Sequence, residues 1–421
     1  MRNIIAIILI VVMLCLTTAY AQDNWELRII IGVATPGQAQ AVANYGHYAL
    51  VADMSFGLSL FDIADPGFPI SIGQYNHGGI INDLFVEAHL AYLSHWNRGV
   101  EILSLANPAQ PESLGAFNTP GTTMDVCKSG NLLYAADFFN GLVILDVSDP
   151  GNIRQVGIDT SVVTANAVAV DDTIIYVSAE SAGLYTFTLG DTLHPVRQDF
   201  APLAIDCNDI VIRDNYLLLA CGQAGMLVYD ISDRLHPDSV TAYNTYGTLN
   251  RIAIKDSIAY LADGPAGVVA LNINDPSHPT HIQTLDTPVS ARGIGFYHDF
   301  VLVADDAMLL IVYHEDLNGI DDDNRRLPTD FGIVKCYPNP FNPSTTINFE
   351  LKKRGEISID IYDIQGRHIS RLGSGLYESG KYSLNWNADG HPSGIYFLKL
   401  TGKSEGSNRD ISSTAKLIYL K

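Results

Sequence analysis

Polar side chains recur at a spacing of 42 residues, and they are the groups in this chain best suited to chemistry. One column of the repeat holds Asp53, His95, Asp137, Asp263 and Asp305. Two adjacent columns hold amides and charged groups: Asn82, Asp83, Asp125, Asn166, Asn208, Asp209, Asn250 and Arg251. Such groups, when they converge, bind a cation or a polar ligand. Asp and Asn also bond the backbone of their own turns, and the recurrence of Asp favours this architectural role for the first column.

Aromatic residues gather in three consecutive repeats, close to the histidine that departs from the aspartate column. Trp96 and Arg98 follow His95, and the equivalent segments of the neighbouring repeats contain Phe56 and the pair Phe138-Phe139. With Asp83 and Asp125, these side chains form a candidate surface for a sugar or a peptide. The alternative is that the aromatic rings fold back and pack on their own repeats.

The common metal-binding, redox and phosphate-binding motifs are absent from the sequence. It contains no H-E-x-x-H, no C-x-x-C and no P-loop. We therefore assign no catalytic, cofactor-binding or metal-binding residue. An extracellular hydrolase or lactonase remains the alternative, with an acidic, calcium-assisted site built from separate loops.

The elements that position these side chains are short strands. Each unit between Gln40 and Tyr313 contains four apolar runs separated by Gly, Pro, Asn and Asp, and no run has a helical period. A recurring glycine precedes the third run: Gly57, Gly99, Gly141, Gly183, Gly225 and Gly267. Four strands per unit of this length predict a blade of a β-propeller, with a positive φ or a bulge at the glycine. The connections before the first strand and between the second and third strands lie on one face.

The register predicts seven blades. Six repeats are complete, whereas the seventh ends after its third strand, and residues 26–36 have the phase of a fourth strand. We expect the N-terminal strand to complete the last blade, which removes the free edges of an open array. The fold class is therefore all-β, a seven-bladed propeller over residues 22–314 followed by a smaller β-sandwich.

Two cysteines occupy equal distances from a predicted turn. Cys207 and Cys221 flank residues 213–215 and face each other across a hairpin. An oxidising compartment allows a disulfide there, and two buried thiols are the alternative.

Charge and the chain ends indicate export. Residues 1–21 read as a signal peptide, with a basic start, a short apolar run and a small-x-small ending, and no later run is long enough to cross a membrane. Residues 22–333 contain 12 basic and 38 acidic residues, a net charge of −26, whereas residues 334–421 contain 12 and 8, a net charge of +4. An acidic propeller repels phosphates, which argues against nucleic acid as a partner.

An acidic segment at residues 315–333 interrupts the pattern. Its clustered carboxylates suggest calcium, the one cofactor that we considered, but the spacing lacks the glycine and the final glutamate of a calcium loop. A linker is the favoured interpretation.

The repeats resemble a known family. Units such as YLADGPAGVVALNINDPSHP (260–279) and YAADFFNGLVILDVSDP (134–150) are similar to the LVIVP-repeat family of bacterial surface proteins. This resemblance implies a propeller outside the cytoplasm and no particular reaction.

The C-terminal part resembles a second family. YPNPFNPSTTINFEL (337–351), SGIYFLKL (393–400) and the terminal STAKLIYLK are similar to the C-terminal sorting domain of type IX secretion substrates. The resemblance implies the type IX machinery as a partner and delivery across the outer membrane of a Gram-negative-type bacterium, with the tail then cleaved. The residues themselves predict an immunoglobulin-like sandwich of about seven strands over residues 334–421. Together these patterns favour a surface or secreted module for binding or adhesion, with a glycan or protein ligand.

Overall fold

The computed structural model describes residues 25–316 and 331–420, apart from residues 77, 181, 191–192, 204, 340, 352, 364–366 and 405–410. Every regular element in these ranges is a β-strand, and none of them holds a helix long and apolar enough to span a membrane. The chain divides into two compact units, Met1–Asn318 and Gly319–Lys421. The all-β prediction is confirmed.

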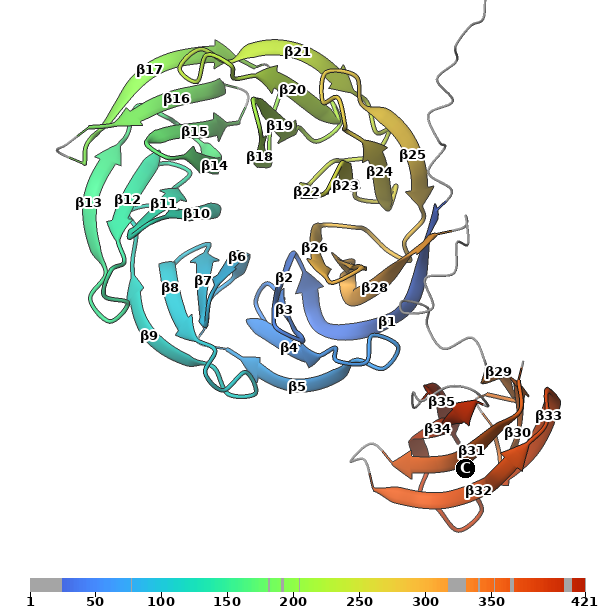
Figure 1. Ribbon diagram of the computed structural model, residues 1–421. Helices are drawn as coiled ribbons and strands as arrows, with labels where there is room; N and C mark the ends of the chain where they lie inside the picture. The colour runs from blue at the N-terminus through green and yellow to red at the C-terminus, as the bar shows by residue number, and fades with distance from the viewer. Residues whose placement is uncertain are drawn as a thin grey trace, which may run out of the picture. The chain divides into compact units, whose positions relative to one another are not determined.

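The first unit is a ring of seven four-stranded antiparallel sheets, or blades (Figure 1). Blades 1 to 3 contain β2 (Ala41–Tyr45), β3 (Tyr48–Ala52), β4 (Leu58–Asp62) and β5 (Ile70–Tyr75); β6 (Ile81–Glu87), β7 (Leu90–His95), β8 (Gly99–Ser104) and β9 (Glu112–Phe117); and β10 (Asp125–Ser129), β11 (Leu132–Ala136), β12 (Leu142–Asp146) and β13 (Arg154–Asp159). Blades 4 to 6 contain β14 (Ala165–Asp171), β15 (Ile174–Ala179), β16 (Gly183–Leu189) and β17 (Pro195–Pro202); β18 (Asp209–Arg213), β19 (Tyr216–Ala220), β20 (Met226–Asp230) and β21 (Asp238–Tyr243); and β22 (Arg251–Lys255), β23 (Ile258–Ala262), β24 (Val268–Asn272) and β25 (Thr280–Leu285). The first strand of each blade is innermost in the ring (Figure 1).

Blade 7 joins the two ends of the propeller. It contains β26 (Gly293–Tyr297), β27 (Phe300–Ala304), β28 (Asp306–Asp316) and, as its outer strand, β1 (Trp25–Ala39). The pairing of β1 with β28 runs from Trp25 opposite Asp316 to Ala39 opposite Asp306. The predicted closure by the N-terminal strand is confirmed.

Local residue chemistry explains the turns of each blade. The six recurring glycines have φ between +72° and +155°, and a Cβ on any of them would lie 2.2 Å from a carbonyl oxygen of the fourth strand. The connection from the third to the fourth strand starts with a side-chain cap in which, for example, Ser148 N–H donates to Asp146 Oδ1 at 3.0 Å. Asp and Asn favour such turns because their oxygens accept from the backbone two residues later.

The core lies between the blades. One cluster joins Leu50 and Leu60 of blade 1 to Leu93 of blade 2, and another joins Tyr134 of blade 3 to Phe187 of blade 4. Because each blade buries its faces against its neighbours, the ring is stabilised as a whole and the loops are presented on a rigid frame.

The second unit is a two-sheet sandwich. One sheet has the order β29 (Phe331–Tyr337), β30 (Ser344–Leu351), β33 (Gly380–Asn387), and the other has the order β32 (His368–Tyr377), β31 (Gly355–Asp363), β34 (Gly394–Ser404), β35 (Ile411–Tyr419). Its core includes Phe341, Trp386 and Tyr419, and Phe341 lies 5.3 Å from each of the other two rings. The strand number agrees with the predicted sandwich.

The predicted linker boundaries were too wide. Residues 315–316 belong to β28, because the N-terminal strand starts early enough to pair with them, and residues 331–333 belong to β29. The rest of the acidic segment, where calcium was considered, and the predicted signal peptide lie outside the described residues.

Candidate functional site

The candidate site lies on the face of the ring that carries the connections before the first strand and between the second and third strands of each blade; we call it the site face. Antiparallel order places these two sets of connections on the same side of every sheet. All of the predicted ligand-binding residues belong to them or to the strand ends beside them.

The recurring aspartates hold the site face together. Asp53, Asp137 and Asp305 accept hydrogen bonds from the backbone N–H groups of Gly37, Gly121 and Val289, at 2.7–3.0 Å. Each donor lies 16 residues earlier: Gly37 near the end of β1, the outer strand of blade 7, and Gly121 and Val289 in the connections that follow the outer strands of blades 2 and 6. Burial raises the pKa of the Asp53 and Asp137 carboxyls, and it raises the pKa of Asp263 to about 6. This geometry is the architectural role favoured by the sequence.

His95 lies inside the ring instead of facing solvent. It is 2% exposed, and its Nε2 lies 3.2 Å from Oε2 of Glu101, which is equally buried. Glu101 Oε1 accepts hydrogen bonds from the Tyr75 hydroxyl of blade 1 and the Ser113 hydroxyl, at 2.8 and 2.7 Å. Glu101 therefore joins blades 1 and 2, and His95 is buried against it instead of lying on a ligand-binding surface. The sequence did not indicate this burial, because Glu101, the partner of the His95 imidazole, lies on β8 and not in the loop where His95 was expected.

A charge cluster occupies the centre of the ring. The Arg251 guanidinium, from blade 6, lies 3.2 Å from Asp83, 3.7 Å from Asp125 and 3.5 Å from Asp209. These carboxylates belong to blades 2, 3 and 5, so the arginine reaches across to strands far from its own. The side chains of all four residues are at most 19% exposed.

Two of these carboxylates also accept hydrogen bonds from the innermost strand of the following blade. Asp125 Oδ2 accepts from Val168 N–H at 2.9 Å, and Asp209 Oδ2 accepts from Ile252 N–H at 2.8 Å. Burial raises the pKa of Asp209 to about 6 and that of Asp83 well above its ordinary value, although Arg251 opposes both shifts. For Arg251, the attraction of the carboxylates outweighs burial and raises the pKa.

A ring of amide side chains lies next to the charge cluster. Three of them, Asn82, Asn208 and Asn250, directly precede Asp83, Asp209 and Arg251 in the sequence. The side-chain N–H groups of Asn82, Asn166 and Asn250 donate to the carbonyl oxygens of Thr123, Cys207 and Ala291, at 3.0–3.1 Å. Each bond connects a blade to the next one, 41 residues later. Asn166 also donates to Asn208 Oδ1 at 2.9 Å. The sequence predicted these amides at the inner rim.

The amide ring surrounds a small pocket, which we call the channel-mouth pocket. It has a volume of about 220 Å³ and is lined by Gln40, Met54, Asn82, Trp96, Met124, Asn166, Asn208, Asn250, Arg251 and Arg292. Trp96 is 47% exposed, so its indole is available beside this polar lining. The pocket therefore combines an apolar aromatic surface with amide and guanidinium groups.

The other predicted aromatics do not line this pocket. Phe56 is 45% exposed and lies against the backbone of Gly37. Phe138 and Phe139 make an edge-to-face contact at 4.6 Å, and Phe139 is 68% exposed. Arg98 is half-buried and donates to the carbonyl oxygen of Gly78 at 3.0 Å. Of the eight predicted ligand-binding residues, the structure thus places only Trp96 at the pocket, with Asp83 and Asp125 held by its lining residue Arg251.

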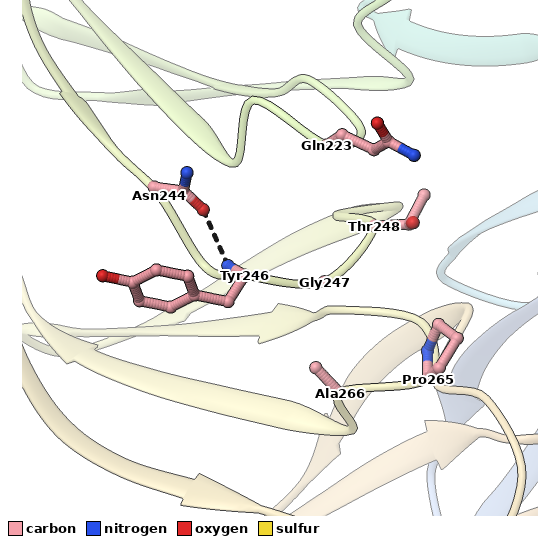
Figure 2. A pocket seen from close by; sticks show the side chains of 7 residues that line it. All are labelled: Gln223, Asn244, Tyr246, Gly247, Thr248, Pro265 and Ala266. Carbon is pink, nitrogen blue, oxygen red and sulfur yellow. Dashed lines mark hydrogen bonds between the residues drawn. The ribbon is translucent and has the colours of Figure 1, made fainter.

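A second hollow lies on the site face between blades 5 and 6 (Figure 2). It has a volume of about 660 Å³ and is lined by Gln223, Asn244, Tyr246, Gly247, Thr248, Pro265 and Ala266. Tyr246 is 92% exposed with φ of +65°, and its N–H donates to Asn244 Oδ1 at 2.8 Å. Its ring points away from Gln223 and Thr248 (Figure 2), so it does not cover the polar groups of these two residues.

Cys207 and Cys221 form a disulfide behind the amide ring. The carbonyl oxygen of Cys207 accepts hydrogen bonds from Asn166 and from the Ser178 hydroxyl of blade 4. The crosslink therefore fixes the point where blade 4 is attached to blade 5. Cys127 and Cys336 are free thiols.

Loss of this disulfide is expected to destabilise the propeller. The two cysteines are 14 residues apart, and closing a loop of this length contributes about 3 kcal/mol in the chain-entropy description. The double variant Cys207→Ser/Cys221→Ser should lower the denaturation midpoint, and reductant should lower the wild-type midpoint by the same amount. The Cys127→Ser variant, measured in parallel, should leave the response to reductant unchanged. Equal midpoints with and without reductant in the wild type would contradict a stabilising crosslink.

Some residues at the site were missed at the sequence level. Gln40 and Arg292 line the pocket and occupy the same column of the repeat as Asn82 and Asn250. The spacing of 42 residues could therefore have predicted both. Glu101 stands where the other repeats have Ser59, Val143, Tyr185, Leu227, Val269 and Ile311. One acid in a column of otherwise uncharged residues could have indicated a buried partner.

Comparisons with known proteins agree with this architecture. Residues 335–413 match the family described as secretion system C-terminal sorting domain. Residues 36–77, 120–159, 206–245 and 246–287 match the LVIVD repeat, which is the repeat noted above under a slightly different name. No curated protein matches the chain.

Solved structures support the propeller fold alone. The crystal structure of the β-propeller domain of Cps50 (Swd1) from Myceliophteria thermophila is similar with a TM-score of 0.55 and 9% identity, and the match covers 68% of this chain and 99% of that one. The computationally designed Ika8 protein is similar with a TM-score of 0.52 and 10% identity over the same shares of the two chains.

Proposed function

Because this chain is a β-propeller with LVIVD repeats, secreted through a type IX C-terminal sorting domain to the cell surface or the extracellular space, we propose that the propeller is a binding module for an extracellular ligand. The binding surface in this proposal is the site face, and its centre is the channel-mouth pocket. Adhesion through that ligand is the role that fits delivery to the cell surface.

Trp96 is the observation that carries the proposal. A large apolar side chain with 47% exposure at the edge of a polar pocket offers apolar area that a ligand in the pocket can bury. Tryptophan is also enriched among the residues that dominate binding energy, since it buries a large rigid surface and donates one hydrogen bond.

The charge cluster argues for binding over cation-assisted hydrolysis. Three carboxylates meet at the centre of the ring, but Arg251 already supplies the positive charge between them. In the part of the chain that the structure describes, no group of three His, Cys, Asp or Glu side chains is arranged to hold a metal ion. The carboxylates instead hold the inner strands together, as the hydrogen bonds to Val168 and Ile252 indicate.

The proposal predicts that Trp96→Ala removes ligand binding without unfolding the ring. The mature chain and the variant would be melted with panels of glycans and peptides, because a ligand at 100 times its Kd stabilises the folded state by about 2.7 kcal/mol. We expect a stabilising shift for the wild type and at least a tenfold loss of affinity in the variant, with an unchanged melting temperature in buffer. Phe139→Ala, an exposed aromatic outside the pocket, is the matched control. Equal shifts for wild type and Trp96→Ala would contradict the proposal.

A further inference from the structure

The channel-mouth pocket has features that restrict the chemistry of its ligand. From its charge balance, hydrogen-bonding groups and size, we propose that it binds the terminal sugar ring of a neutral glycan, with the ring stacked on Trp96. This inference rests on the proposed binding function and names the ligand class of the same site.

Both cations at the pocket are already neutralised. Arg251 is paired with three carboxylates, and Arg292 Nε lies 2.9 Å from Asp306 Oδ1. An anionic ligand would therefore have to displace carboxylates that also cap neighbouring strands. It would also approach a propeller whose residues 22–314 include 10 basic and 32 acidic side chains, a net charge of −22, which repels anions. A neutral ligand avoids both costs.

The hydrogen-bonding groups of the lining match hydroxyls. The bonds that join the blades use amide N–H groups of Asn82, Asn166 and Asn250. No described residue donates a hydrogen bond to the side-chain oxygens of these three asparagines, so the oxygens remain as acceptors at the pocket. An amide also has a second N–H, and a hydroxyl both donates and accepts. A cyclic polyol can thus satisfy several amides at once.

The apolar lining of the pocket and its volume also suit a sugar ring. Trp96 supplies a flat apolar surface, and Met54 and Met124 add apolar lining. One face of a sugar ring exposes C–H groups while its edges carry hydroxyls, so stacking on the indole leaves the hydroxyls directed at the amides. A volume of about 220 Å³ lies below the usual range for pockets that hold drug-sized ligands and suits a single ring.

The test is a titration of the full mature chain with defined sugars. The probes are neutral oligosaccharides ending in hexose, deoxyhexose or N-acetylhexosamine, matched oligosaccharides ending in a uronic or sialic acid, and uncharged peptides. Calorimetry would be run on the wild type, Trp96→Ala, Trp96→Phe and, as a control at the second hollow, Tyr246→Ala. We expect saturable binding of at least one neutral series, at least tenfold weaker in Trp96→Ala, partly restored in Trp96→Phe and unchanged in Tyr246→Ala.

The outcomes separate this inference from the proposed function. Peptides or acidic sugars that bind in a Trp96-dependent way, with neutral sugars inert, would overturn the neutral-glycan inference and leave the binding site in place. Binding that is equal in wild type and Trp96→Ala would overturn both. Neutral-sugar binding lost in Tyr246→Ala and retained in Trp96→Ala would move the sugar site to the second hollow and overturn the inference.

Discussion

A chain that lacks residues 25–36 is expected to lose cooperative folding of the propeller. The deletion removes the outer strand of blade 7 and leaves the backbone groups of β28 unpaired along an exposed edge. It also removes Leu27, which is 1% exposed and whose N–H donates to the side-chain oxygen of Gln283 in blade 6 at 2.6 Å. Denaturation followed by circular dichroism should show a broad transition at low denaturant, and the purified protein should aggregate.

Two single substitutions in β1 test the same closure without removing the strand. Leu27→Ala removes buried apolar volume from β1 and should lower the free energy of unfolding by about 2–5 kcal/mol. Glu26→Ala changes the adjacent exposed residue and should have an effect within about 0.5 kcal/mol. A Leu27→Ala chain as stable as the Glu26→Ala chain would show that the N-terminal strand does not hold the ring closed.

Arg251→Ala is expected to be the most damaging single substitution at the centre of the ring. It leaves Asp83, Asp125 and Asp209 buried without the cation that they share. Removing one partner from a buried ion cluster costs about 3–5 kcal/mol, because the remaining charges keep their desolvation penalty. Arg154→Ala is the matched control, since its solvent-exposed pair with Asp146 should contribute little to stability. Urea denaturation of the three proteins at neutral pH gives the comparison.

The pH dependence of stability provides a separate check on this cluster. The folded-state pKa of Asp209 is about 6, above its ordinary value of 3.8, so the folded state binds more protons between these values. The contribution of Asp209 is therefore fully present below about pH 3.8 and is lost as the pH rises through 6. In Arg251→Ala the stability should recover partly when the pH is lowered from 7 to 5, because protonation relieves the repulsion among the carboxylates. A variant deficit that stays constant or grows over that range would contradict this account of the cluster.

Much of the fold follows from the repeat. The spacing of 42 residues predicts the blades, the glycine column predicts the positive φ, and the phase of residues 26–36 predicts the closing strand. These features are local or strictly periodic, so an assignment made in one repeat applies to the equivalent positions of the others. The linker ends were predicted less well because strand length depends on a partner distant in sequence, as the pairing of Trp25 with Asp316 shows.

The sequence predicted which repeat positions lie at the candidate site, but it did not predict which of their side chains contact each other. The polar inner rim and Trp96 follow from register, because residues in one column occupy equivalent places on successive blades. Which side chains meet depends on reach across the ring, as in the pairing of Arg251 with Asp83. The burial of His95 depends on Glu101 and on Tyr75 from the preceding blade, and no single repeat contains all three. Contacts of this kind require the assembled ring.

The fluorescence of Trp96 during a sugar titration tests the central claim most directly. The chain has three tryptophans, of which Trp386 is 3% exposed and poorly accessible to a quencher. In a Trp25→Phe variant of residues 22–421, acrylamide quenching and its change with ligand therefore report mainly on Trp96. Titration with the neutral oligosaccharides should shift the emission to shorter wavelength and protect it from acrylamide, with the same midpoint as calorimetry. Calorimetric binding that leaves the Trp96 emission and its quenching unchanged would place the ligand elsewhere and contradict a binding site at the channel-mouth pocket.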